Sequence, residues 1–455
     1  MKYKIKRLAA LLLSMAAVLG LFIPAASAAP APEVSAGAAL LMDAANDELL
    51  YEKNAHKKMY PASLTKVMTA LLVLEAVEAG QLSTEQTVTA SSTFSAGLSI
   101  YGSSQNIKAG EQMSLLDLLY CLLVASANES ANILAETVAG DVDTFVARMN
   151  ERAAQLGCEN THFANAHGLH DDNHYTTAHD IYLIARAAME NKTFRTIVSS
   201  KRHEIAPTNL SDKRLFYSTN ALLVTWFYRE SYLYDKAIGI KTGTTDEGGY
   251  CLLSAAEDEG RYLICVVLNA AMVEKPDKSM DRRQFSESRA LLQWGFSNFR
   301  RQQIVDTDTP LAQVAVTLSD TDHVLVRPAS KLERTLPKDL DLSAVKQTVH
   351  LNSDSVAAPV EEGQVLGTLT LSHGDQTLGQ VDLVAVSAVE RSTLLYRLHQ
   401  IKSLFRHTAV KLIFGLLVLA LAVFILYKIL KPSRRSRYGS KRYGSRANYR
   451  GRRRR

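Results

Sequence analysis

The chain has 455 residues, enough for two domains with separate hydrophobic cores. Its formal net charge of +6 comes from the two ends. Four of the basic residues lie within the first seven residues, one is Lys411, and thirteen follow Tyr427. Without these eighteen, the rest of the chain has 34 basic and 46 acidic residues, a net charge of −12. An acidic central part argues against nucleic-acid binding there, and no nucleic-acid partner is expected.

Residues 1–28 have the pattern of a secretory signal peptide. Four basic residues precede the apolar run Leu8–Ile23, and Ala26–Ala28 forms a small-residue cleavage site. An uncleaved anchor helix is the alternative, because the apolar run approaches the length of a membrane span. The chain is therefore expected to be secreted through this segment.

The part of the chain from residue 29 to about 300 mixes helix and strand patterns and is expected to form one domain. A β-hairpin is predicted around Asn46, between strands at Ala38–Met42 and Glu48–Tyr51. Helical spacing and strand alternation predict six further elements. The helices are expected at Ser63–Gly80, Leu115–Val124 and Ile181–Met189, and the strands at Ala237–Thr242, Gly249–Ala256 and Tyr262–Asn269. The sheet would then take its strands from both ends of the domain.

Ser63 and Lys66 lie three residues apart at the start of a predicted helix, so both side chains point to one face. The pair offers a nucleophilic hydroxyl and an amine that can take its proton, near a helix N-terminus that favours negative charge. The lysine is a base only if its pKa falls, which burial and a second cation such as Lys241 would cause. The alternative is an ordinary helix cap beside a solvated lysine.

A second short motif, Ser126-Ala127-Asn128, follows the helix predicted at Leu115–Val124 and is expected in a loop. The Ser126 hydroxyl can relay a proton between Lys66 and a leaving amine, and the Asn128 side chain can bond a substrate amide. A plain helix-stop signal is the alternative.

A third motif, Lys241-Thr242-Gly243, ends a predicted strand. At a sheet edge, the Lys241 ammonium and the Thr242 hydroxyl can bind a substrate carboxylate, and Gly243 lets the substrate backbone lie close to the strand. The backbone N–H groups of Thr244 and Ser63 are candidates for an oxyanion hole. A turn-capping Thr-Gly pair is the alternative.

The four cysteines lie in the part expected outside the cell, where disulfides can form. Cys121 falls in an apolar helical run and is expected to be a core thiol. Cys251 and Cys265 fall on two strands, roughly opposite each other about the turn at Asp258–Gly260. Paired buried thiols are favoured over a cross-strand disulfide. No spacing suggests a metal site, and no cofactor is expected.

The C-terminal third of the chain has a different sequence pattern. Residues 304–389 contain short runs of Val, Leu and Thr split by turns, which predicts a small all-β domain. Residues 390–408 are expected to form a connector helix. The apolar run that follows predicts a transmembrane helix at 409–430, with Lys411 and Lys428 at its ends. A surface-lying amphipathic helix is the alternative, but the segment has no polar face.

Residues 431–455 hold no acidic residue and are rich in Arg, Tyr, Gly and Ser, so a disordered tail is expected. A basic run beside a membrane helix marks the cytoplasmic side. The chain is therefore expected to be a single-pass membrane protein whose residues 29–410 lie outside the cell.

Together and in this order, the three motifs resemble those of penicillin-binding proteins and class A β-lactamases. The chain as a whole resembles the low-molecular-mass penicillin-binding proteins of the D-alanyl-D-alanine carboxypeptidase family, the S11 serine peptidases. The stretches that carry this resemblance are Tyr60–Thr69, Asn165–Leu169, Tyr175–Asp180, Thr219-Asn220 and Gly239–Thr245. Residues 304–389 resemble the small β domain of that family, most clearly between Ala358 and Gly367.

The resemblance implies an α/β (α+β) serine-acyltransferase fold of the β-lactamase and penicillin-binding type. An antiparallel sheet flanked by helices would be followed by a small all-β domain and one C-terminal transmembrane helix. The partners it implies are peptidoglycan stem peptides as substrates, β-lactams as covalent inhibitors, and the membrane through the C-terminal helix.

The resemblance also implies roles for single residues. Ser63 would attack the D-Ala–D-Ala carbonyl of a stem pentapeptide, with Lys66 as the base and Ser126 as a further catalytic residue. Binding of the substrate would fall to Asn128, Lys241, Thr242, Gly243 and Thr244. D-alanine would leave, and water would hydrolyse the acyl-enzyme. His167 is expected to be a supporting residue, because Lys66 already fills the role of the base.

The chain departs from the proteins it resembles in two places. The middle motif reads Ser-Ala-Asn where class A β-lactamases have Ser-Asp-Asn, and no Glu-centred deacylation motif is evident, which disfavours a β-lactamase. Family members often end in an amphipathic helix, whereas a transmembrane helix and a basic tail are predicted here. The function expected is a D,D-carboxypeptidase. A D,D-endopeptidase that cuts cross-links is one alternative, and a non-catalytic wall-binding protein is another.

Overall fold

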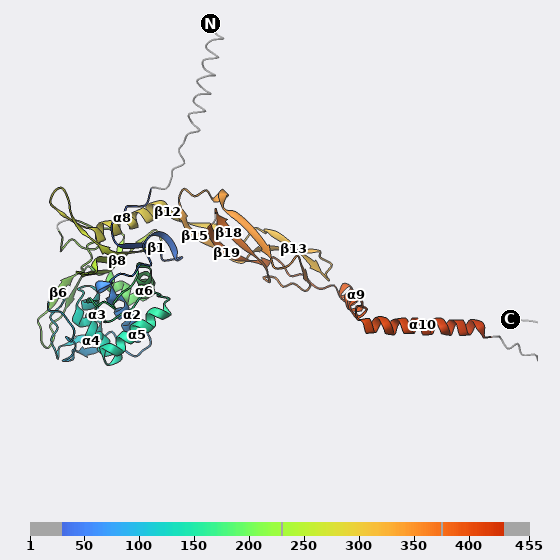
Figure 1. Ribbon diagram of the computed structural model, residues 1–455, viewed down its shortest axis with the longest axis horizontal. Helices are drawn as coiled ribbons and strands as arrows, with labels where there is room; N and C mark the ends of the chain where they lie inside the picture. The colour runs from blue at the N-terminus through green and yellow to red at the C-terminus, as the bar shows by residue number, and fades with distance from the viewer. Residues whose placement is uncertain (1–29, 229–230, 375, 432–455) are drawn as a thin grey trace, which may run out of the picture. The chain divides into compact units, whose positions relative to one another are not determined.

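The structure is a computed structural model that describes residues 30–228, 231–374 and 376–431 (Figure 1). The predicted signal peptide and residues 432–455 of the predicted tail lie outside the described residues. The chain divides into two compact units. The first holds the residues up to Asp306 together with Lys331–Lys346 and Ser372–Leu378, and the second holds the remainder.

A five-stranded antiparallel sheet forms the centre of the first unit, in the strand order β2-β1-β9-β8-β7. Its strands are β1 (Ala38–Asp43), β2 (Glu48–Lys53), β7 (Ala237–Thr245), β8 (Gly249–Asp258) and β9 (Arg261–Ala270). The predicted hairpin and the three predicted strands are confirmed, and the sheet does draw its strands from both ends of the unit. Strand β7 lies at the edge of this sheet and so has one side free for another extended chain.

Helices cover both faces of this sheet (Figure 1). One face packs against a large helical layer, and the other packs against one long helix, α8 (Arg283–Asn298). The helices of the large layer are α2 (Lys66–Glu78), α3 (Leu115–Leu123), α4 (Asn128–Ala139), α5 (Val142–Gln155), α6 (Ala178–Glu190) and α7 (Lys192–Val198). Strands β8 and β9 each have six consecutive buried residues, because both of their faces are covered. Their apolar runs therefore carry little alternation.

The helix predicted at Ser63–Gly80 is two elements. A 3₁₀ turn, η1 (Ala62–Thr65), precedes α2, so Ser63 lies in the tighter turn and Lys66 is the first residue of the α-helix. Three two-stranded ribbons were not predicted. They are formed by β3 (Thr87–Thr89) with β4 (Gln112–Ser114), β5 (Arg202–Ile205) with β6 (Arg214–Tyr217), and β10 (Met272–Glu274) with β11 (Met280–Arg282).

The four cysteines are free thiols. Cys121 is fully buried, as predicted. The expectation that Cys251 and Cys265 lie opposite each other is wrong, because Cys265 pairs with Ser254 across the β8–β9 ladder. Cys251 and Ser254 are three residues apart on β8, so the two thiols point to opposite faces of the sheet and belong to different cores. The favoured alternative, paired buried thiols, is confirmed in that both thiols are free and buried, but the pairing is wrong.

The C-terminal β region is built of short strands, as predicted. Strands β12 (Phe299–Val305) and β15 (Leu332–Pro337) pair with each other and belong to the first unit. A six-stranded sheet of order β16-β18-β19-β14-β13-β17 accounts for the rest. Its strands are β13 (Ala312–Thr317), β14 (His323–Pro328), β16 (Lys346–Leu351), β17 (Ser355–Ala357), β18 (Val365–His373) and β19 (Gln376–Ala385).

Two helices end the described chain. Helix α9 (Thr393–Leu404) occupies the predicted connector, and α10 (Thr408–Leu430) occupies the predicted membrane segment. Among the described residues, α10 is the one helix long and apolar enough to cross a membrane, with a mean hydropathy of 2.8 over its most apolar stretch.

Candidate active site

Several residues pack against the turn that carries Ser63. Ala62 has a φ of 47°, in the left-handed region that residues other than glycine rarely adopt. The Thr65 hydroxyl donates to the Ala62 carbonyl at 2.9 Å and contacts His174 Nε2 at 2.7 Å. Gly168 lies so close that a Cβ there would stand 2.0 Å from the Ala62 carbonyl oxygen. Contacts from Thr65 and Gly168 therefore hold Ala62, the residue before Ser63, in this conformation.

The amine of Lys66 has three oxygen neighbours. Lys66 Nζ lies 3.0 Å from Ser63 Oγ, 2.7 Å from Asn128 Oδ1 and 2.6 Å from the carbonyl oxygen of His167. The whole side chain is buried at 0 % exposure, which is rare for a lysine. Burial is the largest cause that lowers its pKa well below the usual value, and the nearby Lys241 lowers it further, while Glu129 opposes both. Burial and a second cation, the two causes predicted from the sequence, are thus the ones that lower the pKa of Lys66.

The second motif begins at a tight turn between α3 and α4. Ser126 is buried and has a φ of 63°, and such strained residues gather at functional sites. Asn128 is the first residue of α4, and its backbone N–H donates to the Ser103 carbonyl at 2.9 Å. The loop prediction is therefore right for Ser126, whereas Asn128 starts the next helix. Within the described residues, the Ser126 hydroxyl makes no hydrogen bond to Lys66.

The third motif lies on the edge strand β7, beside the nucleophile. A Cβ on Gly243 would stand 3.0 Å from the backbone nitrogen of Ser63, so only glycine lets the two segments lie this close. Lys241 is buried, and this burial lowers its pKa to about 7. Its amine donates to the Thr242 carbonyl at 2.9 Å. The Thr242 hydroxyl lies 2.6 Å from that of Thr219, and Thr244 is exposed on the strand.

His167 contacts Lys66 through its backbone and not through its ring. The ring nitrogen Nδ1 accepts a hydrogen bond from the backbone N–H of Leu169 at 3.1 Å, and burial lowers the pKa of the imidazole to about 3. Asn165 Oδ1 accepts from the backbone N–H groups of both His167 and Gly168. The segment Asn165–Leu169 therefore presents one carbonyl to the lysine.

The structure thus brings Ser63, Lys66 and Asn128 into direct contact and places Gly243 against Ser63. Sequence reasoning did not predict the carbonyl of His167 as a partner of Lys66, nor Thr219 as a partner of Thr242. The signal for both was present, since each lies in a stretch that carried the family resemblance. What a pattern does not show is which atom of such a stretch makes the contact.

Comparison with known proteins decides the family. The D-alanyl-D-alanine carboxypeptidase family of S11 peptidases matches residues 25–272, more than half of the chain. The chain belongs to this family. The C-terminal domain of penicillin-binding protein 5 matches residues 299–391.

Relatives and solved structures agree with this assignment. The D-alanyl-D-alanine carboxypeptidase DacC of Escherichia coli is 31 % identical over 82 % of this chain and 90 % of its own length. DacF of Bacillus subtilis is 27 % identical over 78 % and 86 %. Penicillin-binding protein 5 of Haemophilus influenzae superimposes with a TM-score of 0.64 at 27 % identity, covering 80 % of this chain and all of that one. The chain is accordingly a serine-type D-alanyl-D-alanine carboxypeptidase, a penicillin-binding hydrolase that acts on peptidoglycan.

Proposed function

We propose that this carboxypeptidase removes the terminal D-alanine from stem pentapeptides through an acyl-enzyme on Ser63. The observation that carries the proposal is the contact between a fully buried amine and a serine hydroxyl at 3.0 Å. A hydroxyl is a weak nucleophile until a base takes its proton, and a base must lie within hydrogen-bond reach of that proton.

Lys66 is the base, and its neighbours orient it. A neutral amine has two N–H groups and one lone pair. The carbonyl oxygens of Asn128 and His167 are acceptors only, so they take the two N–H groups. The lone pair is then left for the third neighbour, the hydroxyl proton of Ser63. The proton moves to Lys66 Nζ as Ser63 Oγ forms its bond to the carbonyl carbon of the penultimate D-alanine.

Stabilisation of the tetrahedral intermediate falls to two backbone N–H groups. Ser63 and Thr244 flank the point where Gly243 contacts the nucleophile segment, and their N–H groups form the oxyanion hole. The Lys241 ammonium and the Thr242 hydroxyl bind the terminal carboxylate of the substrate, with Gly243 giving the substrate backbone access to the free edge of β7.

Completion of the reaction requires a proton on the leaving amine. Ser126 delivers it from Lys66, and its buried position in the strained turn before Asn128 supports this role. Asn128 holds both Lys66 and an amide of the substrate. D-alanine departs, and water then hydrolyses the ester on Ser63. A β-lactam that acylates Ser63 leaves an ester that water removes slowly.

The chain is anchored in the cell membrane with its catalytic domain outside the cell. Helix α10 has the length and hydropathy for this, and 23 residues at a rise of about 1.5 Å span the hydrocarbon core. The basic residues after it favour the cytoplasmic side, and the N-terminal signal supplies export. The domains proposed are residues 29–300 for catalysis and 304–389 for the β module, followed by the connector, the membrane helix and the tail.

The test is D-alanine release from diacetyl-Lys-D-Ala-D-Ala by the full chain in detergent, beside the Ser63→Ala variant. We expect release by the natural chain and none by the variant. A folded chain that takes up fluorescent penicillin but releases no D-alanine would contradict the proposal, and loss of cross-linked dimers from purified wall would then assign an endopeptidase. A folded chain that neither binds penicillin nor releases D-alanine would indicate a wall-binding protein without catalysis.

A further inference from the structure

The loop between strands β3 and β4 runs along helix α4, whose side chains hold it at three points. Toward the end of the helix, Glu136 accepts hydrogen bonds from the hydroxyls of Ser91 and Thr93 at 2.6 and 2.9 Å. One turn earlier, Asn132 Nδ2 donates to the Phe94 carbonyl at 2.8 Å. The third point is the first turn of α4, so the loop ends its course along the helix beside the active site.

At this third point one buried carboxylate holds the loop. Oε1 of Glu129 accepts from the Ser104 hydroxyl at 2.8 Å and from the backbone N–H of Gln105 at 2.6 Å. Glu129 is only 3 % exposed, and a buried charge is costly unless it is hydrogen-bonded. The carboxylate and the loop therefore stabilise each other, and residues 102–105, here called the strap, are fastened to α4.

The strap packs against Asn128. The backbone N–H of Asn128 donates to the Ser103 carbonyl at 2.9 Å. A Cβ on Gly102 would stand 2.5 Å from Asn128 Nδ2, so the Gly102 backbone lies directly against the side-chain amide. At its other end the same amide accepts from Lys66 through Oδ1 at 2.7 Å. The amide thus lies between the strap and the base.

We propose that Glu129 is a positioning residue for Lys66. Its carboxylate fastens the strap and so keeps Gly102 against the amide of Asn128. With this contact in place, the amide cannot turn away from Lys66. The inference rests on the proposed function, because it takes Lys66 as the base. Glu129 touches no reacting atom and acts through the strap.

Glu129 also acts on Lys66 through its charge. The carboxylate raises the pKa of Lys66, against burial and Lys241, which lower it. A variant that loses this charge should therefore lower the pKa of Lys66, whereas the loss of a purely structural contact should not. Other titratable or charged groups face Lys66 or Glu129 and stay unchanged in the variants, namely His167, His174, Cys121, Arg214 and Lys108.

The first experiment compares Glu129→Gln with Glu129→Ala by stopped-flow acylation with benzylpenicillin between pH 5 and 10. Glutamine keeps an oxygen that accepts the bonds of the strap but loses the charge. We expect it to keep the highest rate of the profile within about twofold and to move the acid limb to lower pH by about one unit. Alanine releases the strap, and the highest rate should fall by about tenfold or more. An unmoved acid limb in Glu129→Gln, or an unchanged rate in Glu129→Ala, would overturn the inference.

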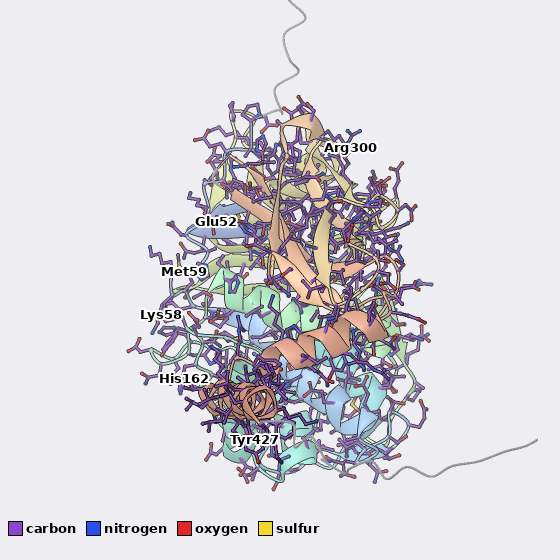
Figure 2. All side chains as sticks on the ribbon, turned by 90° about the vertical axis from the view of Figure 1, so that its right-hand side faces the viewer. Glu52, Lys58, Met59, His162, Arg300 and Tyr427 are labelled. Atoms are coloured by element: carbon purple, nitrogen blue, oxygen red, sulfur yellow. The ribbon has the colours of Figure 1, made fainter. Side chains whose placement is uncertain are left out.

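Glu136→Gln is the matched control. Glu136 holds the other part of the same loop with the same kind of bonds, but it lies seven residues further along α4, about 10 Å at 1.5 Å per residue. Both the rate and the acid limb should stay as in the natural chain. The full chain is used in detergent, because the apolar side chains of α10 are exposed, with Tyr427 labelled in Figure 2.

The second experiment is a double-mutant cycle between Gly102→Ala and Asn128→Ala. In the natural chain the Cβ added at residue 102 displaces the Asn128 amide, and acylation should fall by about tenfold or more. In the Asn128→Ala background the amide is absent, and the nearest remaining neighbour of that Cβ is the Ser99 carbonyl oxygen at 3.2 Å. Gly102→Ala should then change the rate by less than about twofold. Equal losses in both backgrounds would show that Gly102 does not act through Asn128 and would overturn the inference.

D-alanine release by the natural chain is measured beside these variants. A natural chain that is active, with variants that behave like it, would refute the positioning role and leave the carboxypeptidase in place. A natural chain that neither takes up penicillin nor releases D-alanine would refute the proposed function, and this inference with it.

Discussion

Lys66 Nζ donates to Asn128 Oδ1 at 2.7 Å, across 62 residues of sequence. This bond links the first residue of α2 to the first residue of α4 and orients the amine toward Ser63. Because the acceptor is a neutral amide, it orients the amine without stabilising its charged form as a carboxylate would. The identity of residue 128 therefore controls the protonation of the base as well as its position.

The variant Asn128→Asp tests this control. A carboxylate at the same distance favours the charged ammonium and raises the pKa of Lys66, so less of the base is neutral at pH 7. We expect acylation by penicillin at pH 7 to fall by about tenfold or more, and the acid limb of the pH profile to move to higher pH. Stopped-flow acylation between pH 5 and 10 measures both, and an unmoved acid limb would count against Lys66 as the base.

Lys241 is expected to limit activity on the alkaline side. Burial lowers its pKa to about 7, so the amine is charged below that pH and neutral above it. Binding of the terminal carboxylate needs the charge, and kcat/KM should therefore fall as the pH rises through about 7, mainly through KM. The neutral variant Lys241→Gln should have a high KM that no longer changes over this range. A profile for the variant with the same alkaline limb would assign that limb to another group.

Gly168 is expected to tolerate no side chain. Its φ is +86°, and a Cβ would stand 2.0 Å from the Ala62 carbonyl, so Gly168→Ala combines backbone strain with a clash against the turn that carries Ser63. Gly140→Ala is the matched control, because Gly140 has a φ of +89° with nothing within 4 Å of the added atom. We expect a loss of about 1–2 kcal/mol for the control and roughly 3 kcal/mol or more for Gly168→Ala. Urea unfolding of the two variants measures the difference in the free energy of unfolding. Equal losses would show that the Ala62 carbonyl moves away from the added Cβ at little cost, and would contradict the prediction.

His174 should make the folding stability of the first unit fall in acid. Its Nδ1 accepts from the backbone N–H of Ala164 at 3.0 Å, so the ring is held neutral and donates from Nε2 to the Thr65 hydroxyl. Burial is the main cause that lowers its pKa from 6.5 to about 4. The unfolded chain therefore binds more protons than the folded one between these values. The stability that His174 contributes is complete above about pH 6.5 and is lost as the pH falls to about 4, on the order of 3 kcal/mol.

Unfolding followed by tryptophan fluorescence checks this effect, since Trp226 and Trp294, the two tryptophans of the chain, both lie in the first unit. His174→Asn keeps an acceptor and cannot titrate, so the loss of stability between pH 6.5 and 4 should be smaller in the variant. The same slope in both chains would refute the role given to His174.

Much of the site could be predicted from the sequence, because its chemistry lies in short motifs. Ser63 and Lys66 share one helical turn, so their contact follows from spacing alone. The burial of Lys66 and the help of Lys241 also follow, because a lysine can act as a base only under such conditions. The first hairpin and the three later strands of the sheet were found from short apolar runs and the turn residues between them.

Other features depend on tertiary packing that no local pattern records. The break between η1 and α2 reflects the packing of Gly168 and Gly243 against the nucleophile turn, which are distant in sequence. The faces of Cys251 and Cys265 depend on the register of the β8–β9 ladder, and a rough count about the turn missed it. The contact of Lys66 with the backbone carbonyl of His167 could not be predicted from residue types, since any residue at position 167 has such a carbonyl.

The most direct test of the central claim is to find where penicillin attaches. The full chain is treated with benzylpenicillin, digested, and analysed by peptide mass spectrometry, beside the Ser63→Ala and Ser126→Ala variants. The account predicts one penicilloyl group, on the peptide that contains Ser63, absent from Ser63→Ala and present though formed more slowly in Ser126→Ala. An adduct on Ser126, or one that survives in Ser63→Ala, would contradict it.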